Sequence, residues 1–513
     1  MAEKLNLDAL IPRADLAIVN TDTRGKRKDT ISAMDLQTDA FFFLNLNKPD
    51  FQRETTEWDI KKACDFVKSF LTGELIPAII LWQGQSGNIY VIDGAHRLSS
   101  LIAWINDDYG DGVITRKFFN NNITDEQKAI ATKMRALIEK EIGAYRLFVN
   151  ALKSPESYDS PTVQIARNLS SLAIQLQWVE GDVSSAERSF FNINQKASPI
   201  NKTEMKLIEN RKKPVGIAAR AIMSSGFGHK YWSSFAANIQ EEIERIASEI
   251  YEIMFLPKLQ TPIKTTDVPM CGKHNNGALP IIYDFLEICI KNQHKYKDDE
   301  DGSSTVACLK QARKIARLIN SNHESSLGLH PLLYFYSLNG SFRVAAFYAV
   351  TMLVKELDEE NKKHLIVKYR ESFEEIYQQS ANIMQFIIRK ARGAKKGIAP
   401  VKNFLIAILK TLEKGAAKSV VLEEIMKLAE FKDLPLASSF SFDDEEVDFS
   451  SSKKSEIFIR SSIPSINKCA ICNGYLHTNS ISIDHIQRKK DGGLASIDNG
   501  QLSHPYCNTG YKN

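Results

Sequence analysis

The sequence predicts a mixed α+β chain with a small α/β N-terminal domain, a long mainly helical middle and a short C-terminal module stapled by a metal. Three observations carry this prediction. Strand-like and helix-like patterns alternate over 40–115, amphipathic helical periodicity dominates 205–435, and metal-ligand residues crowd into 469–513. With 513 residues the chain is too long for a single compact core, so about two to four domains are expected.

The bulk composition is that of a globular protein without membrane segments. Apolar residues make up 43% of the chain and charged residues 25%, and the net charge is only +4. A nucleic-acid enzyme with this balance has to concentrate its basic residues locally. Neither the N-terminus nor any later stretch has the apolar run of a signal peptide or a membrane span. Of the seven cysteines, the four outside 469–513 are scattered, which predicts a reducing cytoplasm rather than a disulfide framework.

Local patterns predict the elements of the N-terminal part. Helical spacing of apolar residues predicts a helix over Ile60–Leu71, and β-rich runs predict strands over Ile76–Trp82 and Ile89–Ile92. A helix is expected over Ala95–Ile105, directly after an Asp-Gly turn, and 125–180 is expected to be helical.

Composition shifts suggest the domain boundaries. Residues 1–35 are polar and predict a loose arm, 36–215 the α/β domain, and 216–436 the helical body. The Ser-rich, acidic stretch 437–456 cannot bury much and predicts a flexible linker to a module over 457–513. The helical body shows no recognisable chemistry. Scaffolding, homo-oligomerisation and DNA contact all stay open for it.

A closed zinc site is predicted in the C-terminal module. Three thiols and one imidazole occur as two pairs of closely spaced ligands, at Cys469, Cys472, His504 and Cys507. Residue types and paired spacing of this kind are typical of a tetrahedral structural zinc.

A second, harder set of ligands lies between and beside the zinc ligands. Asp484 and Asn508 offer oxygens, which suit Mg²⁺ or Mn²⁺, and His485 stands beside them as a candidate base. A cation placed on a phosphate stabilises the charge of phosphodiester cleavage, while a neutral imidazole takes the proton of water near pH 7. The alternative interpretation is a zinc-stapled module that only binds nucleic acid.

With Asn499 and the Gly-Gly turn at 492–493, these residues resemble the HNH (ββα-metal) endonucleases. The resemblance implies a β-hairpin and a following short helix that hold one divalent ion against the scissile phosphate. It implies that Asp484 and Asn508 are metal ligands, with Asn508 at the start of the helix. It also implies that His485 activates water and that Asn499 ties the hairpin loop and orients the His485 backbone.

The segment Val91–Ser100 is the second candidate site. A strand ends in Asp-Gly and the next helix opens with His-Arg, so backbone N–H groups at the helix start can attract an anion and Arg97 can fork onto a phosphate. Each feature alone has a plainer explanation, since Asp-Gly is a common turn and Arg97 could pair with an internal acid. The candidate ligands in this segment are Asp93, Gly94, His96, Arg97 and Ser99.

Together with Gln52-Arg53 upstream and Asn192–Ala197 downstream, this segment resembles the ParB/sulfiredoxin-like fold of GmrSD-type N-terminal domains and DGQHR proteins. The resemblance covers roughly 40–215 and implies binding of a nucleoside triphosphate, hydrolysed in several members. It adds Gln52, Arg53, Asn194 and Lys196 to the nucleotide site.

The combined prediction is a nucleotide-responsive DNA endonuclease with divalent-metal chemistry, and its architecture resembles systems that restrict foreign or modified DNA in antiphage defence. Two rivals stay open at this point. One is a nucleotide-gated DNA-binding regulator whose zinc module only anchors DNA. The other is a site-specific HNH nuclease of a mobile element.

Overall fold

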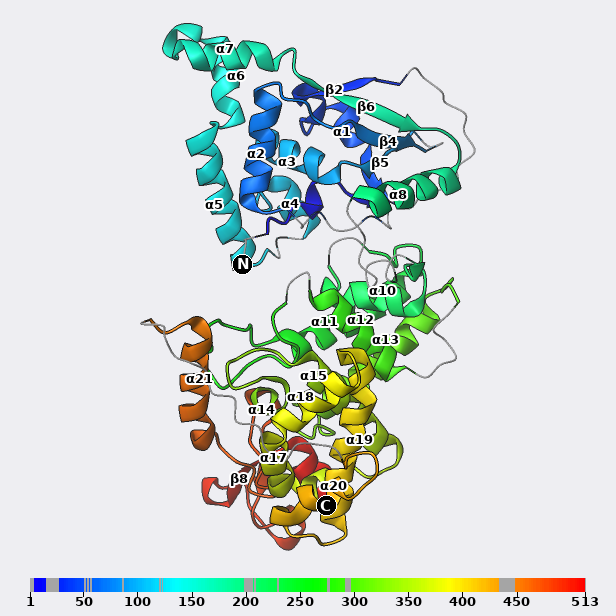
Figure 1. The fold of residues 1–513 in the computed structure, drawn as a ribbon, viewed down its shortest axis with the longest axis vertical. Helices are drawn as coiled ribbons and strands as arrows, with labels where there is room; N and C mark the ends of the chain where they lie inside the picture. The colour runs from blue at the N-terminus through cyan, green and yellow to red at the C-terminus, as the bar shows by residue number, and fades with distance from the viewer. Residues whose placement is uncertain are drawn as a thin grey trace. The chain divides into compact units, whose positions relative to one another are not determined.

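We describe the chain from a computed structural model (Figure 1). The structure describes residues 4–14, 27–49, 52, 55, 58–84, 87–119, 121, 123–197, 206, 209–227, 230–274, 277–290, 297–432 and 448–512. The chain forms two compact units that divide after Arg211, apart from a short segment near 230 that belongs to the first. The mixed α+β class is confirmed, and 57% of the chain is helical. None of the helices in the described ranges could cross a membrane.

A six-stranded mixed sheet forms the centre of the first unit, in the order β1-β3-β5-β4-β6-β2. Neighbours β1/β3, β3/β5 and β4/β6 are parallel, whereas β4/β5 and β2/β6 are antiparallel. The strands are β1 (Arg13–Ala14), β2 (Thr30–Ser32), β3 (Leu46–Pro49), β4 (Ile79–Gln83), β5 (Ile89–Asp93) and β6 (Ala173–Val179).

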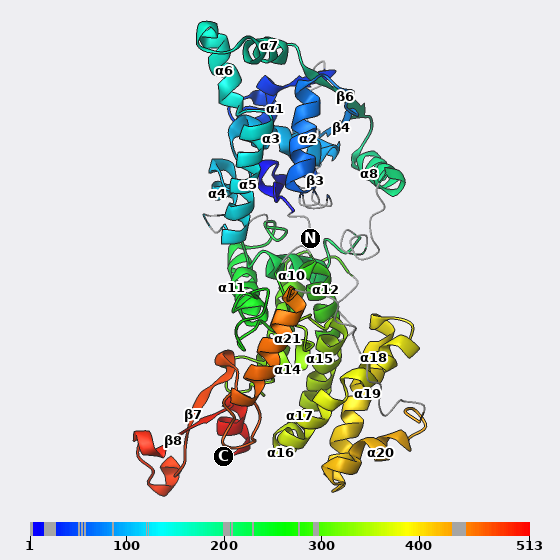
Figure 2. The same ribbon diagram turned by 60° about the vertical axis from the view of Figure 1, so that its left-hand side comes forward.

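Helices cover both faces of this sheet (Figures 1 and 2). One face packs on α2 and α3 around Leu81 and Val91, and the other packs on α8 through Phe190 against Ile92. The helices of the unit are α1 (Phe41–Leu44), α2 (Ile60–Leu71), α3 (Ala95–Asn106), α4 (Val113–Phe118), α5 (Asp125–Glu141), α6 (Tyr145–Lys153), α7 (Ser160–Leu169) and α8 (Val183–Ala197), with short 3₁₀ turns η1 (Asp8–Leu10), η2 (Ala33–Leu36) and η3 (Pro155–Ser157).

The predicted elements around the candidate nucleotide site are present. Helix α2 begins after Asp59, whose carboxylate accepts from the Lys62 backbone N–H at 2.8 Å, and it buries Val67 and Phe70. The helix predicted after Asp93 runs as α3. The prediction of helix through residue 180 is wrong at its end, because β6 alternates buried Ile174 and Leu176 with exposed glutamines and so has the period of a strand.

The prediction of a loose arm over 1–35 is also wrong for its described residues. Leu5, Leu7, Leu10 and Ile11 are buried in the main core of the unit, and Ile31 on β2 joins them. The segment is polar on average, but these apolar side chains hold it against the core, because burying each large aliphatic side chain contributes about 1.5–3 kcal/mol. The charged stretch 15–26 lies outside the described residues.

The second unit combines the helical body with the C-terminal module. The helical prediction for this region is confirmed in the elements α10 (Pro214–Met223), α11 (Ala237–Phe255), α12 (Ala278–Cys289), α13 (Ser303–Ile319), α14 (Pro331–Phe335), α15 (Val344–Glu359), α16 (His364–Lys368), α17 (Arg370–Gln379), α18 (Ala381–Lys390), α19 (Ala394–Glu413), η5 (Lys418–Val420) and α20 (Val421–Met426).

The C-terminal module is small and irregular around one hairpin. Strands β7 (Ser482–His485) and β8 (Gly500–Ser503) pair antiparallel and project from the helical body in Figure 2. A π-helix, η10 (Cys507–Tyr511), follows them. The remaining elements are α21 (Ser451–Ser462), η6 (Ile463–Ser465), η7 (Thr478–Ser480), η8 (Lys489–Asp491) and η9 (Ile497–Asn499).

The end of the predicted linker needs correction. Residues 451–456 form the first turns of α21, capped by Ser450, which accepts from the Lys453 N–H at 3.3 Å. The buried Ser455 hydroxyl accepts from the Ile263 N–H at 3.0 Å and so ties this helix to the helical body. The acidic part, 437–447, lies outside the described residues.

Candidate active site and metal centre

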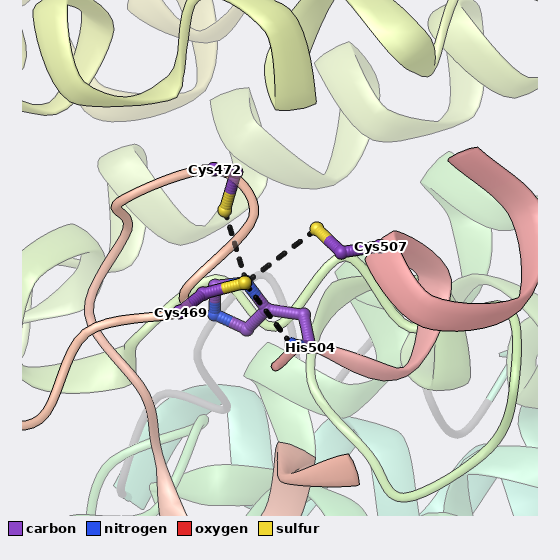
Figure 3. Close-up of side chains that lie close together, drawn as sticks. All are labelled: Cys469, Cys472, His504 and Cys507. Carbon is purple, nitrogen blue, oxygen red and sulfur yellow. Dashed lines mark hydrogen bonds between the residues drawn. The ribbon is translucent and has the colours of Figure 1, made fainter. Parts of the chain in front are cut away.

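The predicted soft-ligand tetrad is assembled in the structure. Cys469, Cys472, His504 and Cys507 are buried, and their ligand atoms all lie within 4.8 Å of one another. Figure 3 shows the three thiols and the imidazole turned toward a common centre. The Cys-x-x-Cys turn closes through a Cys469 N–H bond to the Gly474 carbonyl at 2.8 Å, and the second pair follows β8 directly.

The histidine of the tetrad is oriented for metal binding through Nδ1. This atom lies 3.3 Å from Cys472 Sγ and 3.8 Å from Cys507 Sγ. On the far side of the ring, Nε2 lies 3.1 Å from the Tyr475 carbonyl oxygen, to which it can donate. A hydrogen bond on the outer nitrogen fixes the tautomer that presents a lone pair to a metal. Three thiolates and one neutral imidazole at this spacing fit a closed tetrahedral zinc site.

The tetrad packs directly on the helical body. Gly328, with a backbone φ of +61°, lies so close to the His504 ring that any side chain there would collide with it. Arg370 on α17 donates to the carbonyls of Leu327 at 3.0 Å and Gly328 at 2.8 Å, and pairs with Glu374 at 2.5 Å. This ion pair is buried, since the two side chains are 0% and 2% exposed. Burial, the largest single effect, lowers the pKa of Arg370, but the charge of Glu374 together with those of other neighbouring groups raises it above its usual value.

Further contacts extend this interface around the Cys-x-x-Cys turn. Asn473 donates to Glu371 at 2.5 Å, and Ser480 lies 2.9 Å from Ser326 between their hydroxyl oxygens. The C-terminal module is therefore docked on the helical body. The predicted flexible linker had instead suggested a freely tethered domain.

Two histidines are buried beside this interface. The rings of His330 and His477 meet edge to face with centroids 5.2 Å apart. Burial lowers the pKa of His477 to about 4, although Asp267 opposes the shift, and it lowers the pKa of His330 well below its usual value. Both rings are therefore neutral at pH 7 and act as packing residues there.

The hard-ligand residues lie on the hairpin and on η10. Asp484 on β7 is paired with Gln501 on β8, and its Oδ2 accepts from Gln501 Nε2 at 2.7 Å. The same oxygen accepts from Lys512 Nζ at 2.6 Å. Asn508 lies on the same side of the hairpin, because its Nδ2 donates to Ser482 Oγ at 2.8 Å and Ser482 shares a strand face with Asp484.

Asn499 ties the loop of the hairpin as predicted. Its Oδ1 accepts from the Gln487 N–H at 2.7 Å, and its Nδ2 donates to the carbonyls of Gln487 at 3.1 Å and Leu494 at 2.8 Å. His485 ends β7 opposite Gly500 and is half-buried. The donor set of a carboxylate and an amide next to this imidazole fits a hard divalent ion.

Some of the candidate nucleotide residues lie at one edge of the N-terminal sheet. Parallel strands β3 and β5 end side by side, so Gln52 and the turn Asp93-Gly94 follow at the same edge. Gly94 has φ +96°, and a side chain there would collide with Ile79. The His96 ring stacks on Trp58 with centroids 5.7 Å apart.

Arg97 is held by protein groups in this structure. Its guanidinium pairs with Asp93 Oδ2 at 2.6 Å and donates to the carbonyls of Pro77 and, at 3.3 Å, Ala78. The acid that pairs with Arg97 is therefore Asp93, which lies four residues earlier in the chain, at the end of β5. Buried Ser99 Oγ and Gln52 Oε1 have no hydrogen-bond partner among the described residues.

The remaining predicted ligands are less well defined. Arg53 lies outside the described residues. Asn194 and Lys196 lie on α8, which packs on β5, and only their backbone is described.

Several polar residues of the sites were missed by the sequence prediction. Buried Asp8 accepts from Lys48 Nζ at 2.8 Å, from Arg13 and from the Thr55 N–H at 2.9 Å, beside Gln52. Burial alone would raise the pKa of Asp8, but Arg13 and Lys48 hold it well below its usual range. No local motif marks these residues. The contacts of Gln501 and Lys512 with Asp484, and those of Arg370 with Leu327 and Gly328, could not be predicted for the same reason, because the fold brings these partners together.

The hairpin, the zinc-type tetrad and the π-helix have the order of elements that the HNH (ββα-metal) resemblance implies. In agreement, residues 469–513 match the family of HNH endonucleases. Residues 36–211 match the N-terminal domain of GmrSD restriction endonucleases. No curated protein and no solved structure matches the chain. The two domain matches confirm the predicted architecture, that of a restriction-type nuclease, and the endonuclease domain implies a DNA substrate.

Purified protein is expected to hold one zinc per chain, and Cys472→Ser should lose it. The tetrad packs on Arg370 and Gly328, so zinc loss should also lower the thermal midpoint of the second unit while leaving the first unchanged. Elemental analysis and thermal unfolding measure both effects. Cys64→Ser, a change at a buried cysteine of the first unit, is the matched control and should keep the zinc. Absence of zinc from the wild-type protein would contradict the tetrad.

Proposed function

We propose that the chain is a divalent-metal-dependent DNA endonuclease whose activity responds to a nucleoside triphosphate bound by the N-terminal unit. The observation that carries the nuclease part is the hairpin site. The nearly buried Asp484 and the half-buried His485 follow each other on β7, and the Asn508 amide on η10 bonds to Ser482 of the same strand.

Each residue of the hairpin has a distinct role in this proposal. Asp484 and Asn508 would hold Mg²⁺ or Mn²⁺, which supplies stabilisation for the negative charge that develops on the phosphate and the leaving oxygen. His485 takes the proton of the attacking water as the phosphodiester bond breaks. Asn499 keeps the loop after His485 in one conformation through its three hydrogen bonds to Gln487 and Leu494.

The zinc-type tetrad acts as a structural support for this site. Cys507 precedes the metal ligand Asn508, and His504 follows β8 after Ser503. A metal bound there fixes the start of η10 against the hairpin. Gly328, whose carbonyl accepts from Arg370, packs on the His504 ring and so links the tetrad to the helical body.

Nucleotide binding is the second part of the proposal. The start of α3, directly after Gly94, lies at the sheet edge where β3 and β5 both end, and backbone N–H groups at a helix start attract phosphate. The buried oxygens of Gln52 and Ser99 supply polar atoms near these strand ends. The biology that fits a restriction-type nuclease with such a unit is defence against foreign or modified DNA.

In this proposal the Arg97 guanidinium leaves Asp93 for a phosphate of the nucleotide. Arg97→Ala is therefore expected to weaken nucleoside triphosphate binding by about tenfold or more, because a hydrogen bond to a charged group is worth about 1.5–3 kcal/mol. Isothermal titration with ATP and GTP measures this change. Arg135→Ala, which breaks ion pairs with Asp107 and Asp111 elsewhere in the first unit, controls for a general loss of stability. Unchanged affinity in Arg97→Ala would place the pocket elsewhere.

The proposed biology is tested by substrate comparison. Plain plasmid and DNA carrying modified bases are incubated with Mg²⁺, with and without each nucleoside triphosphate. Cleavage that depends on a modification or on a nucleotide supports the restriction role. Cleavage of one short sequence, regardless of either, would instead favour a site-specific nuclease.

A further inference from the structure

Lys512 lies against the carboxylate that the proposed function assigns to the divalent ion. Its Nζ is 2.6 Å from Asp484 Oδ2 and 2.6 Å from the His485 carbonyl oxygen. The ion pair is largely shielded from water, with the Lys512 side chain 17% exposed and the Asp484 side chain 5% exposed. Gln501 donates to the same oxygen. The ammonium group thus contacts the carboxylate that would hold a divalent ion.

The π-helix after the zinc-type tetrad places Lys512 at this point. The Lys512 N–H bonds to the carbonyl of Cys507, five residues earlier, at 3.1 Å. Single turns of π-helix are frequently found at functional sites. Because the turn starts at a buried tetrad cysteine, the backbone of Lys512 is held while its four-carbon side chain can still turn.

We propose that Lys512 and the divalent ion exchange at Asp484, and that a DNA phosphate draws Lys512 away. The inference rests on the proposed metal-binding role of Asp484. An ammonium and a divalent cation on one carboxylate oxygen repel each other, so the ammonium leaves when the ion enters. The displaced Lys512 ammonium needs a new hydrogen-bond acceptor. A phosphodiester oxygen of the DNA substrate would be an anionic acceptor within the same site.

Metal and DNA therefore bind with positive cooperativity. DNA lowers the free energy needed to displace Lys512, and by linkage a bound metal ion strengthens the contact of Lys512 with DNA to the same extent. A lysine suits this exchange better than an arginine, because its compact charge on a flexible stem can change partner without losing a planar fork. The residue thereby couples loading of the metal to the presence of substrate.

The test measures Mn²⁺ affinity by electron paramagnetic resonance on zinc-loaded, full-length protein carrying His485→Ala, so that DNA is not consumed. In this background Lys512→Met should bind Mn²⁺ about tenfold or more tightly without DNA, since it removes a charge-assisted hydrogen bond from Asp484. A short duplex should tighten Mn²⁺ binding when Lys512 is present and do so far less in Lys512→Met. Lys512→Arg, which keeps the positive charge beside Asp484, should keep the weaker DNA-free Mn²⁺ affinity of the parent.

Lys489→Met is the matched control, because it removes the same charge from the exposed η8 turn of the same module. It should leave the DNA-free Mn²⁺ affinity unchanged. Equal or weaker Mn²⁺ affinity in Lys512→Met, or full DNA-induced tightening in that variant, would overturn the exchange. Mn²⁺ binding that survives Asp484→Asn would instead show that the proposed metal site itself is wrong.

Discussion

Replacing His485 by alanine is expected to reduce Mg²⁺-dependent DNA cleavage by about 10²–10⁴-fold, the usual contribution of a positioned general base. The residue ends β7 next to Asp484, and the Asn499 loop holds the backbone that follows it. The imidazole is half-buried and forms no hydrogen bond that would anchor the fold within the described residues, so the loss should appear in the rate rather than in stability. Initial rates on supercoiled plasmid measure the change.

The matched control is His364→Ala, a histidine that is exposed at the start of α16. This variant should cleave at the wild-type rate. Zinc content measured on both proteins shows whether the tetrad is intact. Full Mg²⁺-dependent cleavage by His485→Ala would mean that another group takes the proton from water.

Arg370→Ala is expected to cost the second unit about 3–5 kcal/mol of unfolding free energy, because it leaves the Glu374 carboxylate buried without its partner. The substitution also frees the carbonyls of Leu327 and Gly328, which accept from Arg370 beside the His504 ring. The loss should therefore reach the tetrad, and zinc should transfer faster to a chromophoric chelator. Urea unfolding and the transfer rate measure the two effects.

Arg460→Ala provides the comparison with an exposed ion pair. Arg460 meets Glu456 one turn earlier on α21 at 2.6 Å, with side chains 64% and 36% exposed. Exposed pairs contribute about 0–1 kcal/mol, so this variant should stay near the wild type. An Arg370→Ala protein as stable as Arg460→Ala would mean that the buried pair on α17 does not stabilise the part of the helical body on which the tetrad packs.

The contrast between these two arginines shows what the sequence can predict. Helix α2, strand β5 and the start of α3 follow from patterns within a few residues, and the tetrad follows from residue types at short spacing. Arg370 carries no such mark, because its partners Leu327 and Gly328 are more than 40 residues away in the chain. The contribution of Arg370 to stability depends in part on its contacts with Leu327 and Gly328, which form only when the chain folds.

The same reasoning explains the errors at the N-terminus and around the metal site. Average polarity over 1–35 concealed the leucines that complete the core of the first unit. Asp8, Lys48 and Arg13 look like ordinary surface charges until β1 and β3 bring them together. Lys512 was visible as a basic residue, but its contact with Asp484 depends on the π-turn of η10, which no local propensity indicates.

The most direct measurement is cleavage of supercoiled plasmid by the wild-type protein with Mg²⁺ or Mn²⁺, with and without each nucleoside triphosphate, on both plain and modified DNA. We expect conversion to the nicked or linear form under at least one of these conditions, stopped by a chelator of divalent ions. Stoichiometric DNA binding with no new ends under every condition would contradict the account and favour a DNA-binding regulator.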